Sequence, residues 1–428
     1  MIFGTPRAHK DMKYGSSALA DHRDWQPTTT GLGACRGSAR ACIGAKPKRW
    51  TGIMLNFQGR PVREQFEMVD DVVYLRGANI CPCARSVSEA VAHFMGVWQS
   101  GGDACWKLAE EAFEDGKALF AGLVGADPGQ IATVENTSMG ISMAASLIAP
   151  QAGTNVVVDE LTHQSNVYPW MIRPDVEIRY AQSEGGAVPL SAFEKLVDTQ
   201  TAAINVCHVT MGHGFRHDLA ALAELAHRHD AYLVVDGAQS VGVVPIDVVG
   251  LDFLACPTFK WLFGPLGAGF LYVRKELHTL GPPPVVGWMS AQNPENFDIH
   301  SMKLHDDARR LQRGVHNAVG LVAAAAGLRI IDALGLDSIW EHVRGLSRRL
   351  LEGLKDMELE VLTPFEDEHR AGIVAFRVSD TARRQAALAQ RGVLAGQYLP
   401  DQIRMDVSLY HHEQDIERTL GAVAEVIQ

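Results

Sequence analysis

The sequence predicts an α/β protein, with a mainly parallel sheet in a large domain and a smaller α+β domain at the C-terminal end. Two observations carry this prediction. Short β-branched runs alternate with amphipathic helical patterns through the middle of the chain, and three further strand patterns follow a long apolar helical stretch. Alternating strands and helices need crossover connections, which bring parallel strands together and cover both faces of the sheet with helices.

The elements follow one another in a regular order. Helical spacing covers residues 86–99 and 105–125, where Gly125 is a suitable helix stop. A helix is also expected at residues 218–229. The β-branched runs predict strands at residues 131–135, 155–160, 201–209, 231–236 and 267–273. After a long helix at 318–335, a small antiparallel sheet with flanking helices is expected from residues 373–378, 393–399 and 403–410.

The length of 428 residues suits one large and one smaller domain. Residues 1–53 stand apart, because they hold nine Lys and Arg against three acids and show no sustained periodicity. We expect a disordered tail or a true start at Met54, and a basic, acid-poor transit peptide is the alternative. The large domain is then expected to span residues 54–320, including an N-terminal segment, and the small domain residues 321–428.

Charge and cysteine content exclude several classes of protein. The net charge of −11 argues against nucleic-acid binding, and no apolar run approaches the ~18 residues of a membrane span. The seven cysteines include no CxxC pair, which favours reduced thiols in a cytoplasmic protein, with organellar import as the alternative. The histidines lack the spacing of metal ligands, so no metal is expected.

Polar side chains gather where the predicted strands end. Asp236, His163 and the pair Thr137 and Ser138 each follow a different strand, so they could converge with Lys260 on one cleft. Desolvation lowers the pKa of a buried Lys, which leaves its amine free to form an imine. A carboxylate that faces a pyridine nitrogen would keep that nitrogen protonated. The alternative for the Asp and the Lys is a structural ion pair.

Residues 234–273, VVDGAQSVGVVPIDVVGLDFLACPTFKWLFGPLGAGFLYV, resemble the signature of class V aminotransferases. These are enzymes of fold type I that use pyridoxal 5′-phosphate (PLP), and the resemblance extends from about Val73 to the C-terminus. It implies a seven-stranded type of sheet, PLP as cofactor, a small amino-acid substrate and a homodimer. By this resemblance Lys260 would carry the cofactor, Asp236 would pair with its pyridine nitrogen, and Gln239 would bind its phenolic oxygen.

The same resemblance assigns the remaining site residues. His163 would stack on the cofactor ring and could shuttle protons, although a core histidine is the alternative. Thr137 and Ser138 would bind the phosphate, where an ordinary helix cap would use the same residues. Arg404 would clamp the substrate carboxylate with two parallel hydrogen bonds, and a surface arginine is the alternative.

Some positions depart from the family pattern. Pro257 and Phe259 stand where many relatives have groups that contact the phosphate or a proton, so those contacts are absent or come from Thr258. Residues 314–317 read GVHN, where the family often has Gly-Thr-x-Asn reaching across a dimer to the phosphate. Val315 cannot supply that hydroxyl, although His316 or Asn317 could compensate.

The segment before Arg404 bears on the reaction. Cysteine desulfurases of this family need a loop cysteine there, because sulfur must pass to a thiolate. Residues 391–406 contain no cysteine, and none follows Cys256. Residues 207–219 and 259–265 look more like the epimerase and sulfoxide-lyase branch.

We therefore expect a PLP-dependent aminotransferase acting on a small α-amino acid through Lys260. A C–S (sulfoxide) lyase or an epimerase of the same family is the alternative. A non-catalytic PLP-binding scaffold is the alternative from another class.

Overall fold

The computed structural model describes residues 54–427, so the expectation for residues 1–53 lies outside the described part of the chain. The described residues belong to a single unit, Thr51–Gln428. Within it, no single helix is both long and apolar enough to cross a membrane. Two consecutive helices, Ala318–Leu334 and Leu336–Asp356, meet that criterion only as a pair, and they are bent by 81° at the break between them.

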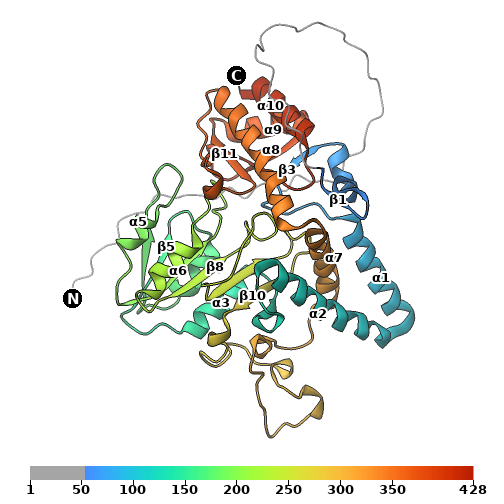
Figure 1. Ribbon diagram of the computed structural model, residues 1–428, viewed down its shortest axis with the longest axis vertical. Coiled ribbons are helices and arrows are strands. Elements are labelled where there is room, and N and C mark those ends of the chain that lie inside the picture. The colour runs from blue at the N-terminus through green and yellow to red at the C-terminus, as the bar shows by residue number, and fades with distance from the viewer. Residues whose placement is uncertain (1–53, 428) are drawn as a thin grey trace, which may run out of the picture. The chain divides into compact units, whose positions relative to one another are not determined.

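The large sheet contains seven strands in the order β4-β10-β9-β8-β7-β5-β6 (Figure 1). They are β4 (Ile131–Val134), β5 (Asn155–Asp159), β6 (Glu177–Ala181), β7 (Thr201–Cys207), β8 (Tyr232–Asp236), β9 (Phe253–Pro257) and β10 (Gly269–Val273). Neighbours are parallel except at β10, which runs antiparallel to both β4 and β9. The predicted α/β class, with a mainly parallel seven-stranded sheet, is confirmed.

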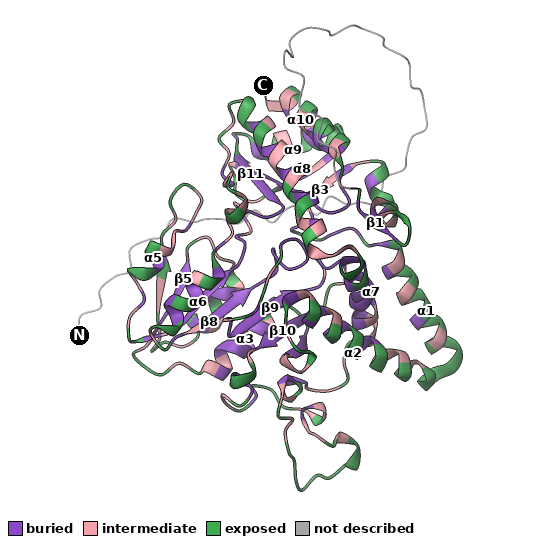
Figure 2. Cartoon of the chain, in the orientation of Figure 1, coloured by how far each residue is buried: buried purple, intermediate pink, exposed green. Residues whose placement is uncertain are grey.

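Helices α2 (Cys105–Val124), α3 (Thr137–Ile148) and α6 (Leu219–His227) pack on this sheet. The other helices of this part are α1 (Arg85–Gly101), which packs mainly on α2 and α7, α4 (Tyr168–Met171), α5 (Leu190–Glu194) and α7 (Ala318–Leu334). Strands β5, β9 and β10 are buried along their whole length, as the purple arrows in Figure 2 show. A strand buried at every position must be covered on both faces, which explains its continuous apolar sequence. Helix α2 ends at Gly125, which adopts the left-handed conformation that glycine favours.

A second, four-stranded sheet has the order β11-β13-β12-β3. Its strands are β11 (Ile373–Arg377), β12 (Val393–Gln397), β13 (Gln402–Asp406) and β3 (Val73–Leu75), and the helices after α7 are α8 (Leu336–Asp356), α9 (Thr381–Gln390) and α10 (Glu413–Ile427). Strand β13 is antiparallel to β11 and β12, as expected, but β3 joins β12 in parallel. The N-terminal part of the described chain, which begins with the short hairpin β1 (Asn56–Phe57) and β2 (Arg60–Pro61), thus contributes a strand to the C-terminal sheet.

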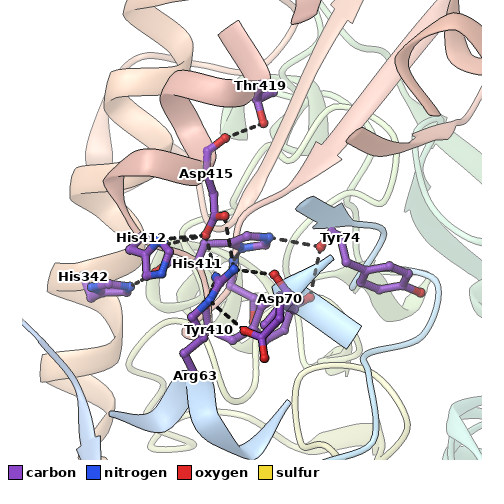
Figure 3. A network of polar contacts seen from close by, with 11 residues as sticks. Arg63, Asp70, Tyr74, His342, Tyr410, His411, His412, Asp415 and Thr419 are labelled. Atoms are coloured by element: carbon purple, nitrogen blue, oxygen red, sulfur yellow. Dashed lines mark hydrogen bonds and ion pairs between the residues drawn. The ribbon is translucent and has the colours of Figure 1, made fainter. Parts of the chain in front are cut away.

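A buried polar network secures this N-terminal segment against the C-terminal helices (Figure 3). Arg63 Nη1 donates to Asp415 Oδ2 at 2.7 Å, and His411 Nε2 lies 3.1 Å from the carbonyl oxygen of Tyr74. His342 Nε2 lies 2.8 Å from the carbonyl oxygen of His411. Burial lowers the pKa of His411 to about 4, so its ring is neutral at pH 7. Strand β3 is therefore held by side-chain contacts as well as by its pairing with β12.

Candidate functional site

A cleft of about 520 Å³ lies at the carboxyl ends of the strands in the large sheet. Six of the predicted site residues line it: Thr137, Ser138, His163, Asp236, Gln239 and Lys260. Asp236 is the last residue of β8, and Lys260 follows β9 by three residues. Parallel strands end at the same edge, so side chains far apart in sequence meet there. The predicted convergence on one cleft is found.

Lys260 lies deep in the cleft with its amine largely surrounded by protein. This burial lowers the pKa of Lys260, the carboxylate of Asp236 opposes the shift, and the charge of Arg404 adds to it. A lysine with a lowered pKa holds more of its amine in the unprotonated, nucleophilic form. The surroundings of Lys260 therefore favour covalent chemistry at its Nζ.

Asp236 is 4% exposed, and it faces hydrogen-bond donors on both oxygens. Its Oδ1 accepts from the backbone N–H of Ala238 at 2.8 Å. Its Oδ2 accepts from Asn166 Nδ2 at 3.2 Å and lies 3.7 Å from Cys207 Sγ. These donors hold the carboxylate in one orientation.

Gln239 has an orientation that a neighbouring indole determines. Trp261 Nε1 donates to Gln239 Oε1 at 2.8 Å, and Gln239 Nε2 donates to the carbonyl oxygen of Ala78 at 3.1 Å. An indole N–H can only donate, so the amide oxygen must face it. The second hydrogen on Nε2 is then available to an acceptor in the cleft, such as a phenolic oxygen.

His163 lines the same cleft, and its ring is fixed by the chain that follows it. The backbone N–H of Ser165 donates to His163 Nδ1 at 3.1 Å, so the proton of the neutral ring sits on Nε2. Burial lowers the pKa of His163, Asp236 opposes that shift, and Lys260 adds to it. A neutral imidazole with a proton on Nε2 suits contact with a flat ring and can also donate a proton.

The first turn of α3 forms the polar end of the cleft. Asn136 caps the helix by accepting from Met139 N at 3.0 Å, and Ser138 Oγ lies 2.6 Å from Ser165 Oγ. Thr137 is 7% exposed, and its Oγ1 has no hydrogen-bond partner among residues 54–427. An unpaired buried hydroxyl beside free helix N–H groups is well suited to an anion such as a phosphate.

Thr258 is not brought to the cleft. Its Oγ1 lies 2.8 Å from the carbonyl oxygen of Pro265 and 3.0 Å from that of Ala268, so its hydrogen is used inside the turn that follows β9. Gly264 packs directly on this side chain, because a Cβ there would lie 2.5 Å from that of Thr258. The residue shapes the turn that carries Lys260, and the structure gives no support for a phosphate contact.

Arg404 is 4% exposed, which excludes a surface arginine. Its Nη1 donates to the carbonyl oxygen of Met211 at 2.8 Å, its Nη2 donates to Asn79 Oδ1 at 2.5 Å, and its Nε lies 3.1 Å from Asp406 Oδ1. It does not line the cleft, although its charge reaches Lys260. Each terminal nitrogen keeps one further hydrogen with which to bind a carboxylate.

The GVHN segment exposes Val315, which has no side-chain donor, and Asn317. Val315 is 59% exposed, whereas His316 stacks on Phe113 with ring centroids 3.9 Å apart. Asn317 accepts from Gly320 N and donates to the carbonyl oxygen of Gly267, each at 3.0 Å. Asn317 is therefore engaged within its own chain, whereas His316 Nε2 has no hydrogen-bond partner among residues 54–427.

The fold and this cleft together define a PLP-dependent enzyme of fold type I. The family model for aminotransferase class V matches residues 73–394, and the chain belongs to that family. Among residues 54–427, no group of three His, Cys, Asp or Glu side chains is placed to hold a metal ion.

Similar proteins carry more than one named activity. The chain is 29% identical over 321 residues to the uncharacterized aminotransferase YcbU of Bacillus subtilis, covering 74% of this chain and 85% of that protein. It is 25% identical over 394 residues to a protein of Pyrococcus abyssi named probable cysteine desulfurase, covering 86% and 97%. A cysteine desulfurase from Thermococcus onnurineus has the same fold, with a TM-score of 0.78, 24% identity and coverage of 86% and 97%.

The cystine C–S lyase C-DES also has this fold, with a TM-score of 0.79 and 19% identity over 85% of this chain and all of that one. A second C-DES structure contains glycine covalently linked to the PLP cofactor. The cofactor of the present chain is PLP, and the cleft suits it in three respects. It offers the amine of Lys260, the carboxylate of Asp236 as a hydrogen-bond acceptor, and the unpaired buried hydroxyl of Thr137.

Proposed function

We propose that this chain is an aminotransferase that acts on a small α-amino acid, with Lys260 as its catalytic base. The observation that carries the proposal is the placement of Lys260, whose pKa is lowered by burial, in one cleft with Asp236 and His163. PLP, when bound, accepts the electron pair that a departing α-proton leaves behind.

Each residue of the site would have a separate role in binding the cofactor and the substrate or in moving the proton. Asp236 would accept a hydrogen bond from a protonated ring nitrogen, and Gln239 would donate one to the phenolic oxygen. Arg404, which lies behind Met211 at the wall of the cleft, would hold the substrate carboxylate, and Lys260 Nζ would remove the proton from the substrate's α-carbon. Transfer of the amino group would also require a proton to be delivered at a second carbon, and Lys260 Nζ, which would already hold the α-proton, can deliver it.

Sulfur transfer in the manner of a desulfurase is not supported by the thiols of this cleft. Cys207 is the one cysteine among the residues that line it, and burial raises its pKa well above the ordinary value. A thiol held in its neutral form is a poor acceptor of sulfur. In the β12–β13 connection, where a loop cysteine would be needed, the ring of Tyr398 packs on Gly212.

Elimination by a C–S lyase is the second candidate, and His163 is the observation that favours it. Its Nε2 holds a proton in the neutral ring, and the residue lines the cleft. Such a group can protonate a leaving sulfur atom. Epimerisation would need the same α-proton removal, followed by return of a proton to the other face.

A panel of amino acids incubated with the holoenzyme, with and without pyruvate, distinguishes these reactions. We expect conversion of the cofactor band to that of pyridoxamine phosphate, reversed by a 2-oxo acid. Release of pyruvate or another 2-oxo acid without the pyridoxamine form would contradict transfer and establish elimination. A cofactor band that no amino acid changes would indicate the non-catalytic scaffold.

We further propose that the enzyme is a homodimer. Three tryptophans, on α1, on α2 and in the short helix Trp288–Ser290, are about half exposed, namely Trp98 at 51%, Trp106 at 50% and Trp288 at 51%. Trp106 and Trp288 line an apolar hollow of about 870 Å³, and exposed apolar area of this kind marks interaction surfaces. Light scattering is expected to give twice the chain mass of 46.6 kDa, and a single-chain mass at micromolar concentration would refute the proposal.

A further inference from the structure

A series of buried side chains that do not line the cleft is hydrogen-bonded to Asp236. Asn166 Nδ2 donates to Asp236 Oδ2 at 3.2 Å, and Asn205 Nδ2 donates to Asn166 Oδ1 at 2.9 Å. Trp170 Nε1 donates to Asn205 Oδ1 at 2.9 Å. Trp170, Asn205 and Asn166 are completely buried, and they come from α4, β7 and the short helix Gln164–Asn166.

The direction of every hydrogen bond in this series of side chains is determined by Trp170, the residue furthest from Asp236. An indole N–H can only donate, so Asn205 must present its oxygen to Trp170 and its nitrogen to Asn166. Asn166 must then present its oxygen to Asn205 and its nitrogen to Asp236. Reversing either amide would set two donors or two acceptors against each other in a buried site, which is costly.

The remaining amide hydrogens are also used, so neither side chain can turn without losing a partner. Asn205 Nδ2 donates to the carbonyl oxygen of Val234 at 3.0 Å, and Asn166 Nδ2 donates to Cys207 Sγ at 3.2 Å. Asp236 therefore meets only donors from the protein, including the backbone N–H of Ala238. A carboxylate whose oxygens face donors acts as an acceptor, so whatever it meets in the cleft must also donate a hydrogen bond.

We propose that Trp170, Asn205 and Asn166 are positioning residues, which act through Asp236 to keep the ring nitrogen of the cofactor protonated. The proposal rests on the proposed pairing of Asp236 with that nitrogen. The three side chains touch Asp236 or one another, so their effect on the cofactor passes through the carboxylate. The Asn166 amide stabilises the charge of the carboxylate, and the Asn205 and Trp170 dipoles strengthen that hydrogen bond.

The test is to compare Asn166→Ala and Trp170→Phe with the unaltered holoenzyme and with Val206→Ala. Val206 is a buried β7 residue between Asn205 and Cys207, and alternation along the strand places it on the other face. Three quantities are measured in the absence of substrate: the dissociation constant of PLP, the pH midpoint of the visible absorption band, and the denaturation midpoint.

Asn166→Ala is expected to weaken PLP retention about tenfold or more, because a hydrogen bond to a charged group is lost. The pH midpoint of the band is expected to rise. Without the amide, the Asp236 carboxylate is less firmly oriented toward the ring nitrogen and the ring carries less positive charge. The Lys260 nitrogen bonded to the cofactor then keeps its proton to higher pH. Trp170→Phe is expected to shift both quantities in the same direction by a smaller amount.

Val206→Ala is expected to lower the denaturation midpoint without moving the pH midpoint. If Asn166→Ala and Trp170→Phe both lower the denaturation midpoint but leave the pH midpoint unchanged, the residues serve packing alone and the proposal is wrong. Trp170→Phe preserves an aromatic ring, so it decides the matter even where Asn166→Ala fails to fold. Asp236→Asn tests the proposed pairing of Asp236 with the ring nitrogen separately. If this variant leaves the absorption band and PLP retention unchanged, that pairing is wrong, and the positioning role of the three residues is refuted with it.

Discussion

Replacing Lys260 with Ala is expected to abolish turnover and to remove the covalent link between the chain and its cofactor. The amine of Lys260 is the only group in the described cleft that can both bond to the cofactor and move the α-proton, and its lowered pKa keeps it nucleophilic. Borohydride reduces an imine to a stable amine. The unaltered protein should therefore retain the cofactor through denaturation after reduction, and Lys260→Ala should lose it.

The fold is expected to survive this substitution, because the missing side chain leaves a gap that opens to the cleft and can fill with water. Far-ultraviolet circular dichroism and the denaturation midpoint check this point. Lys275→Ala serves as a matched control, since Lys275 lies in a short helix after β10 and away from the cleft. A reducible adduct that persists at the same peptide in Lys260→Ala would show that another residue binds the cofactor.

Replacing Asp236 with Asn is expected to lower kcat by about 100-fold or more, equivalent to about 3 kcal/mol of barrier. The physical reason is the loss of the negative charge that keeps the ring nitrogen protonated. The new side-chain amide would also place its NH₂ group against the Asn166 or the Ala238 N–H, and two hydrogen-bond donors cannot pair with each other. PLP affinity is expected to fall as well.

Steady-state kinetics and the spectrum of the bound cofactor measure these effects. Asp247→Asn is a suitable control, because Asp247 is an exposed carboxylate eleven positions further along the same segment. A near-normal rate together with an unchanged spectrum in Asp236→Asn would show that this carboxylate has another role.

Much of the fold follows from local sequence patterns. The strands β5 and β8 end where their β-branched runs end, and α2 stops at Gly125 as its sequence predicts. Strands β6 and β9 were not predicted from the sequence, for different reasons. Strand β6, EIRYA, lies at the edge of the sheet and is only partly buried, so it lacks an apolar run. Strand β9, FLACP, is fully buried but contains no β-branched residue.

The strand β3 could not have been assigned to its sheet from local pattern. Its three residues, Val73–Leu75, pair with Val393–Ala395, more than 300 positions further along the chain. Nothing in a three-residue segment identifies so distant a partner, because the pairing depends on how the intervening domain folds.

The sequence by itself determined which side chains of the motif meet in the cleft, because Asp236, Gln239 and Lys260 lie in one short segment whose spacing is set by two adjacent strands. The tertiary structure decided what supports them. Asn166 reaches Asp236 across 70 positions and Asn79 reaches Arg404 across 325, while Thr258, inside the motif, turns away from the cleft. Motif spacing places a backbone, but the hydrogen-bond partners of a buried side chain depend on which distant segments fold against it.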